Sequence, residues 1–150
     1  MRNKNAKHLM VAKAIAQLSK DSSTQVGAIA IGKGGEFLAS GWNGAPRGCS
    51  ADEPDDLRSE RPEKYFWFSH AEANTITNAA RVGTPLAGST LVVTHFPCMD
   101  CARVIVQAGI VKVVVPEPEF DFAMRWREHI DRAKRLFNEC GVHVEYVNGD

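Results

Sequence analysis

A histidine, a glutamate and two cysteines stand at spacings that suit a metal centre. His70 and Glu72 are two residues apart, and Cys98 and Cys101 form a Cys-x-x-Cys pair directly after a proline. Imidazole nitrogen and cysteine thiolate are ligands that zinc prefers. His70, Cys98 and Cys101 therefore predict three ligands to one zinc ion, with one carboxylate left over.

Three protein ligands are one short of a closed zinc site. Structural zinc usually has four, whereas catalytic zinc keeps its fourth position for a water whose pKa falls toward about 7. Two thiolates weaken that effect by donating charge, so a carboxylate is needed to take the proton of the water, and Glu72 is the candidate. A structural site closed by His95 or Cys49 stays open as the alternative, with Glu72 then on the solvated surface.

Length and charge limit the class of protein. The 150 residues suit one domain, which we assign to residues 1–150. Lys plus Arg and Asp plus Glu number 18 each, so no long-range positive field exists to attract an extended nucleic acid. No apolar run approaches the roughly 18 residues that span a bilayer, and the N-terminal residues lack a secretory signal. We expect a cytoplasmic protein without a membrane partner.

Hydrophobic patterns predict the elements that position the ligands. Segments 26–31 and 36–42 are typical of a hairpin, and from residue 90 onward strands alternate with helices, which requires parallel pairing. The pattern predicts an α/β fold of three layers, α/β/α, around a central mixed five-stranded sheet. Predicted strands are 26–31, 36–42, 90–95, 111–115 and 142–147, and predicted helices are 5–19, 70–81, 97–107 and 122–140.

Two segments of the predicted fold carry further expectations. The long loop 41–63, with a short helix at 55–59, leads into four aromatic residues, 65–68, which we expect to pack down and deliver His70. The helix 122–140 has a charged outer face of mixed sign that includes Arg125. Both ligand motifs stand at strand-to-helix junctions, where the partial positive charge of a helix N-terminus favours cysteine thiolates.

The combination His70-Ala71-Glu72 with Pro97-Cys98-x-x-Cys101 is the signature of zinc-dependent nucleobase deaminases. Over residues 8–147 the chain resembles deoxycytidylate (dCMP) deaminases, which have the cytidine deaminase-like fold. The resemblance implies hydrolysis of dCMP to dUMP and ammonia, one catalytic zinc per chain, and Glu72 as proton shuttle. The segments that carry it, besides the zinc motif, are Ser23-Thr24-Gln25-Val26-Gly27-Ala28, Gly41 to Gly48 and Gln107-Ala108-Gly109-Ile110.

The resemblance also implies how a nucleotide would be held. Val26 would pack on the base, Asn43 would bind the deoxyribose hydroxyl, and the backbone of Ala71 would help to hold the pyrimidine. Arg81 stands where the family often has an arginine near the nucleotide or a subunit contact. Phe120 would lie near the substrate, where many relatives have a tyrosine whose hydroxyl this chain lacks.

Candidates for the 5′-phosphate come from the residue types. Ser23, Thr24 and Arg47 lie in segments that should border the site, and hydroxyls with a guanidinium suit a phosphate. Simpler roles stay open for each of them: Ser23 and Thr24 as turn or cap residues, Arg47 as a solvated charge, and Asn43, which precedes a glycine, as a turn residue.

Three functions are compatible with the sequence. The first is a dCMP deaminase that acts on the free nucleotide. The second is a related zinc deaminase of another cytosine or purine nucleoside or nucleotide, or of tRNA adenosine, although the charges of residues 125–135 are mixed rather than uniformly basic. The third is a non-catalytic zinc-binding module. Family resemblance further implies a homo-oligomer, often a hexamer.

Overall fold

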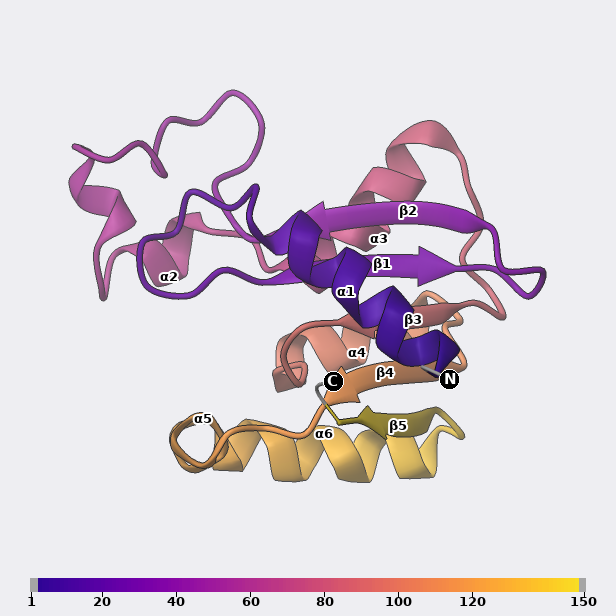
Figure 1. Ribbon diagram of the computed structural model, residues 1–150. Helices are drawn as coiled ribbons and strands as arrows, with labels where there is room; N and C mark the ends of the chain where they lie inside the picture. Colours follow the sequence, from indigo (N-terminus) through magenta and orange to yellow (C-terminus); the bar gives the residue numbers. More distant parts are fainter. Residues whose placement is uncertain (1–2, 149–150) are drawn as a thin grey trace.

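The computed structural model describes residues 3–148 and contains a five-stranded sheet with helices on both of its faces (Figure 1). Every predicted strand is present, within two residues of its predicted bounds. The strands are β1 (Gly27–Ile31), β2 (Phe37–Trp42), β3 (Thr90–Val93), β4 (Lys112–Pro116) and β5 (His143–Val147). The helices are α1 (Lys4–Ala16), α2 (Lys64–Trp67), α3 (Ala71–Val82), α4 (Met99–Gln107), α5 (Phe120–Arg125) and α6 (Arg127–Glu139), with a 3-10 turn, η1, at Leu57–Ser59.

The sheet is mixed, and its strand order is β2-β1-β3-β4-β5. β1 pairs antiparallel with both β2 and β3, whereas β3 with β4 and β4 with β5 are parallel pairs. The predicted hairpin and the predicted parallel crossovers are therefore confirmed. α4 forms the first crossover, and α5 with α6 forms the second.

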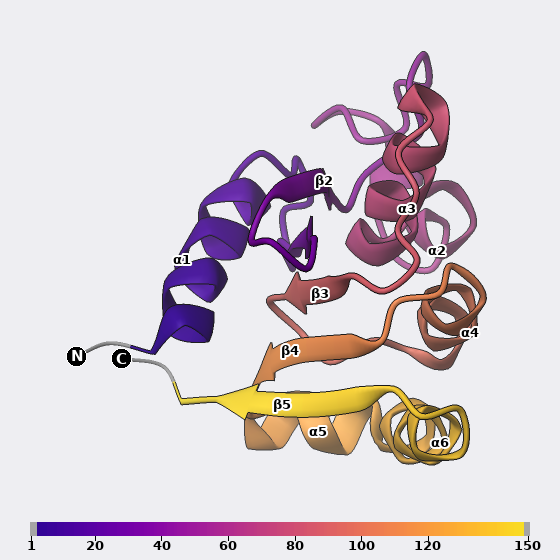
Figure 2. The ribbon, with the colours of Figure 1, turned by 90° about the vertical axis from the view of Figure 1, so that its right-hand side faces the viewer.

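Alternating side chains divide the core between the two faces of the sheet. On β1, Ile29 and Ile31 pack with Leu9 of α1, whereas Ala28 and Ala30 belong to the core cluster on the opposite face. This period of two follows from the pleat of a strand. Figure 2 shows α1 alone on one face of the sheet and α3, α4 and α6 on the other. The three-layer α/β/α arrangement is confirmed.

A glycine lets β2 approach the helix that carries the His-x-Glu motif. A Cβ atom on Gly41 would lie 2.6 Å from the backbone nitrogen of Thr75 and 2.9 Å from the carbonyl oxygen of Ala71. Such separations are shorter than ordinary van der Waals contact, so a larger residue would force α3 away from β2. The absence of a side chain at Gly41 thus helps to place the first turn of α3.

The predicted single helix 122–140 is wrong, because it divides at Trp126. Trp126 has φ −106° and ψ 15°, outside the helical region, and its ring packs 6.3 Å from Phe122 and 5.4 Å from His129. In Figure 1, α6 runs along the sheet whereas α5 is seen nearly end-on. Trp126 also packs against the main core cluster, a tertiary contact that helix propensity does not reveal.

The aromatic run before His70 is more exposed than expected. Tyr65, Phe66 and Trp67 are 56%, 82% and 40% exposed, so the prediction that the run packs down is wrong for these three residues. Phe68 is half-buried, and Lys64, at the start of α2, is buried. A polar side chain, rather than the aromatic ones, anchors this segment. No helix within residues 3–148 is long and apolar enough to cross a membrane.

Candidate active site

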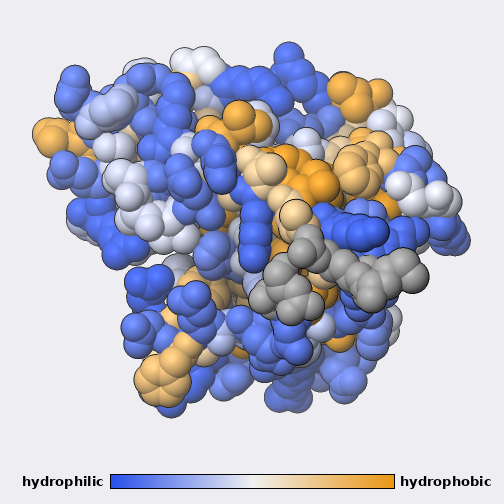
Figure 3. All heavy atoms as spheres, in the orientation of Figure 1, coloured by the Kyte–Doolittle hydropathy of each residue, from blue (hydrophilic) through white to orange (hydrophobic). Residues whose placement is uncertain are grey.

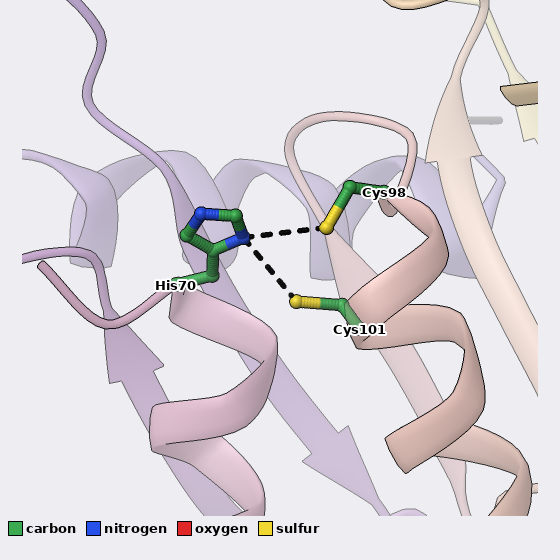
Figure 4. Close-up of side chains that lie close together, drawn as sticks. All are labelled: His70, Cys98 and Cys101. Carbon is green, nitrogen blue, oxygen red and sulfur yellow. Dashed lines mark hydrogen bonds between the residues drawn. The ribbon is translucent and has the colours of Figure 1, made fainter. Parts of the chain in front are cut away.

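His70, Cys98 and Cys101 converge although they are far apart in the sequence. Nδ1 of His70 lies 3.4 Å from Sγ of Cys98 and 3.4 Å from Sγ of Cys101. Figure 4 shows the imidazole at the start of α3 facing both sulfur atoms at the start of α4. The three ligand atoms lie within 4.8 Å of one another, and no fourth His, Cys, Asp or Glu of residues 3–148 joins this cluster.

The spacing of these atoms fits one tetrahedral zinc ion. Zinc–sulfur and zinc–nitrogen bonds of about 2.3 and 2.05 Å at tetrahedral angles place nitrogen and sulfur roughly 3.6 Å apart. The observed nitrogen–sulfur distances of 3.4 Å are close to that value. Neither His95 nor Cys49 belongs to the cluster, so the structure gives no support to a site closed by either residue.

The starts of two helices present the three ligands. His70 and Cys98 are the N-cap residues of α3 and α4, and neither side chain caps its own helix. Cys101 lies in the first turn of α4 and is 3% exposed. N-cap side chains point toward the helix N-terminus, where aligned peptide dipoles favour negative charge. This location favours thiolates and explains why both motifs follow directly after irregular segments.

The ligand side chains strongly affect one another. The hydrogen bond from Cys101 lowers the pKa of the Cys98 thiol to about 4, and the same bond raises the pKa of Cys101. Hydrogen bonding to Cys98 raises the pKa of His70 to about 9. The cluster thus holds a thiolate and shares protons around it. Cation binding at such ligands displaces protons, as expected for a cysteine-rich zinc site.

Glu72 is the buried carboxyl beside the cluster. It lies in the first turn of α3, is 4% exposed, and lines the same pocket as His70 and Cys98. Burial raises its pKa to about 7, while the charge of His70 opposes that rise. A carboxyl with a pKa near neutrality can both accept and donate a proton at physiological pH. The solvated-surface alternative for Glu72 is wrong.

The pocket gathers several of the residues predicted to contact substrate. Val26, Asn43, Ala71 and Thr24 line it together with His70, Glu72 and Cys98. In Figure 1 this region is at the left, with α2 above and α5 below. Figure 3, in the same orientation, shows the surface set back at the left edge between those two parts.

Asn43 is part of a buried polar network that joins three segments. Its Oδ1 accepts from the Val26 backbone at 2.8 Å, and its Nδ2 donates to the Thr24 carbonyl at 2.9 Å and to Asp21 at 3.4 Å. Both amide hydrogens are thus engaged. A lone pair on Oδ1 remains, so Asn43 can only accept a further hydrogen bond.

The centre of this network is a buried ion pair. Nζ of Lys64 lies 3.0 Å from Oδ2 of Asp21, and the two side chains are 8% and 5% exposed. Lys64 also donates to the Ser23 hydroxyl at 2.7 Å, and Asp21 accepts from the backbone of Ser23 and Thr24. These bonds hold α2 against the segment that precedes β1. They form one wall of the pocket.

Four predicted residues do not line the pocket. Ser23 is committed to Asp21 and Lys64, and Arg47 donates to Asn78 at 2.7 Å on the exposed surface. Arg81 lies in the last turn of α3, roughly 16 Å along the helix from His70 at 1.5 Å per residue. Phe120 is 77% exposed, and Phe122 lines the pocket instead.

Sequence analysis missed pocket residues that lie in or next to α2 and α5. Arg61, Lys64, Phe122, Arg125 and Trp126 all line the pocket. Arg125 is exposed, as expected of the charged helix face, but it also lines the pocket, at the end of α5 next to the break at Trp126. No signal in the sequence marks these residues, since their position depends on two irregular connections.

The Asp21–Lys64 pair predicts how stability depends on pH. Burial alone raises the pKa of Asp21, but hydrogen bonds from Ser23, Lys64 and Thr24 outweigh it and lower that pKa below the ordinary 3.8. A carboxyl with a lowered folded-state pKa stabilises the fold above its unfolded pKa and loses that contribution as pH falls through the folded value. We therefore expect Asp21→Asn to lower the free energy of unfolding by about 3–5 kcal/mol at neutral pH.

The difference in the free energy of unfolding between wild type and Asp21→Asn should shrink as pH falls below 3.8, since the wild-type carboxyl then also loses its charge. Urea unfolding at neutral and acid pH measures it. Asp131→Asn, on the exposed face of α6, is the matched control and should change little. A gap of the same size at both pH values would contradict the role of the ion pair.

The layered fold, the His-Cys-Cys cluster and the adjacent buried glutamate define a class, the zinc-dependent hydrolases that use a carboxylate as acid and base. Comparison with known families identifies the family within this class. Residues 2–117 match the cytidine and deoxycytidylate deaminase zinc-binding region. The chain belongs to this family of deaminases, and its cofactor is accordingly zinc.

Individual relatives agree with this membership. A deaminase from the luxG 3′ region of Aliivibrio fischeri is 42% identical over 137 residues, covering 91% of this chain and 88% of the relative. Human deoxycytidylate deaminase is 35% identical over 130 residues, covering 85% and 70%. The dCMP deaminase of cyanophage S-TIM5, solved with dCMP and dUMP, is 30% identical with a TM-score of 0.75, and the match covers 98% of this chain and 100% of that one.

Proposed function

We propose that this enzyme hydrolyses dCMP to dUMP and ammonia. The observation that carries the proposal is the pocket in which Glu72 lies beside the His70, Cys98 and Cys101 cluster. The likeness over nearly the whole chain to a cyanophage dCMP deaminase solved with dCMP and dUMP supports the choice of substrate. Identity of 35% with human deoxycytidylate deaminase supports it independently.

His70, Cys98 and Cys101 would hold the zinc ion. Zinc in such a site supplies Lewis acidity, which makes water a nucleophile at neutral pH. The nitrogen–sulfur distances of 3.4 Å suit this ligand set without rearrangement. The roles of the remaining residues follow from their position around the pocket.

Glu72 would move both protons of the reaction. Its carboxylate takes a proton from the attacking water and delivers it to N3 of cytosine, which makes C4 electrophilic. After the water oxygen bonds to C4, Glu72 carries the second proton to the exocyclic nitrogen. The bond from C4 to that nitrogen breaks, ammonia leaves and uracil remains. The raised pKa of Glu72, about 7 through burial, suits a group that must be in both protonation states during one turnover.

Val26, Ala71 and Asn43 would hold the base and sugar. Val26 is half-buried and offers an apolar surface to the ring, and Ala71 has no bulk that would keep the ring away from the start of α3. Because both amide hydrogens of Asn43 are engaged, we propose that its Oδ1 accepts a hydrogen bond from the sugar hydroxyl. Thr24, on the same wall, is a further polar contact for the nucleotide.

A substrate panel tests the proposed function. Purified protein is incubated with dCMP, deoxycytidine, dCTP and adenosine, and the ultraviolet spectrum of each is followed. Loss of the cytosine spectrum chiefly with dCMP is the expected result. Equal turnover of deoxycytidine, or turnover of adenosine alone, would transfer the assignment to another deaminase. No turnover by zinc-loaded protein would favour a non-catalytic zinc module.

Three expectations from the sequence stay predictions. They are the assignment of residues 1–150 to one domain, a cytoplasmic location, and a homo-oligomer, with a hexamer as the family's frequent state. The exposed Tyr65, Phe66 and Trp67 support self-association. Sedimentation of the zinc-loaded protein measures the oligomeric state directly.

A further inference from the structure

We propose that Arg61 and Arg125 bind the 5′-phosphate of the nucleotide and that the phosphate is held between the two segments that carry them. The inference rests on the proposed function and names the residues that select a nucleotide over a nucleoside. It replaces Arg47 and Ser23 as the phosphate contacts expected from the sequence.

The two arginines reach one pocket from different parts of the chain. Arg61 precedes α2 at the end of the long loop, and Arg125 is the last residue of α5. Both line the pocket that contains Glu72 and the metal ligands. In Figure 1, α2 lies above this region and α5 below it, and residues of both segments line the one pocket.

Arg61 and Arg125 are the pocket cations available for an anion. Within residues 3–148, neither guanidinium forms an ion pair or a side-chain hydrogen bond with another residue. Lys64 lines the same pocket but is 3.0 Å from Asp21, which neutralises it. The other acidic residue in the lining is Glu72, beside the metal cluster. Two positive charges thus remain without a partner.

The charge of Arg125 acts on the imidazole of His95, inside the pocket. Burial lowers the pKa of His95, the charge of Glu119 opposes this effect, and the charge of Arg125 lowers that pKa further. His95 lines the same pocket. A ligand phosphate near His95 would therefore also interact with Arg125.

Guanidinium chemistry suits this assignment. Arginine presents a planar set of donors that pairs with phosphate through two parallel hydrogen bonds. The hydroxyl of Ser23 is already used by Asp21 and Lys64, and Arg47 contacts Asn78 outside the pocket. Binding by Arg61 and Arg125 requires no existing ion pair to break. A nucleoside without phosphate would leave both side chains in water.

The test compares substrates with and without phosphate. Arg125→Gln and Arg61→Gln should each lower the ratio of kcat/KM for dCMP to kcat/KM for deoxycytidine by about 10- to 100-fold, the range for a hydrogen bond to a charged group. Arg125→Lys keeps the charge but not the planar donor geometry of the guanidinium. Its kcat/KM ratio should therefore fall between those of wild type and Arg125→Gln. Arg127→Gln and Arg47→Gln, outside the pocket lining, are matched controls and should keep the wild-type ratio.

Calorimetry separates this inference from the proposed function. Wild-type protein should bind dUMP more tightly than deoxyuridine, and Arg125→Gln should lose about 10- to 100-fold of that difference. If wild type fails to deaminate dCMP but shows this pattern, the proposed function fails and the phosphate assignment survives. An unchanged ratio and unchanged dUMP affinity in both glutamine variants, with thermal unfolding like that of wild type, would overturn the inference alone.

Discussion

Glu72→Gln is expected to lower kcat for dCMP by about 10²- to 10⁴-fold, the usual range for a general acid and base. The amide has nearly the shape of the carboxyl but cannot carry a proton from water to the base. Because Glu72 is not one of the three clustered ligand residues, zinc content should stay at the wild-type level. Ammonia release measures turnover, and elemental analysis measures the metal.

The control for this change is another glutamate that does not line the pocket. Glu128→Gln, on the exposed first turn of α6, should keep both turnover and zinc. Turnover by Glu72→Gln within a few-fold of wild type would show that another group moves the protons. Loss of zinc from this variant would instead make Glu72 part of the metal site.

Removal of a metal ligand is expected to abolish turnover and to destabilise the protein. Cys101→Ala removes a buried thiol and leaves two of the three clustered ligands. Because zinc binds only the folded site, its loss removes stabilisation of about 4 kcal/mol at a free zinc concentration of about 1,000 times the dissociation constant. Zinc per chain, turnover and unfolding temperature should all fall.

A chelator makes this second prediction sharper. Zinc removal from wild type should lower its unfolding temperature toward that of Cys101→Ala, and the chelator should not affect the variant. Cys140→Ala, which removes an exposed thiol outside the cluster, should retain zinc and still respond to the chelator. Full zinc occupancy in Cys101→Ala would be incompatible with the proposed ligand set.

Much of the fold could be predicted because its signals are local. A continuous apolar run such as Leu91, Val92 and Val93 marks a strand that is buried on both faces, and the order of strands and helices from residue 90 onward requires parallel crossovers. The break at Trp126 and the exposure of Phe66 escaped prediction. Both depend on what the aromatic rings meet in three dimensions, which local pattern does not reveal.

By itself, the sequence determined the chemistry of this protein. Ligand types and spacing identified His70, Cys98 and Cys101, and the residue two positions after His70 gave the carboxyl, because zinc coordination and proton transfer each require particular side chains. Tertiary structure alone decided which cations line the pocket. Arg61 and Arg125 line the pocket whereas Arg47 does not, since the positions of α2 and α5 depend on a buried ion pair and a helix break formed only on folding.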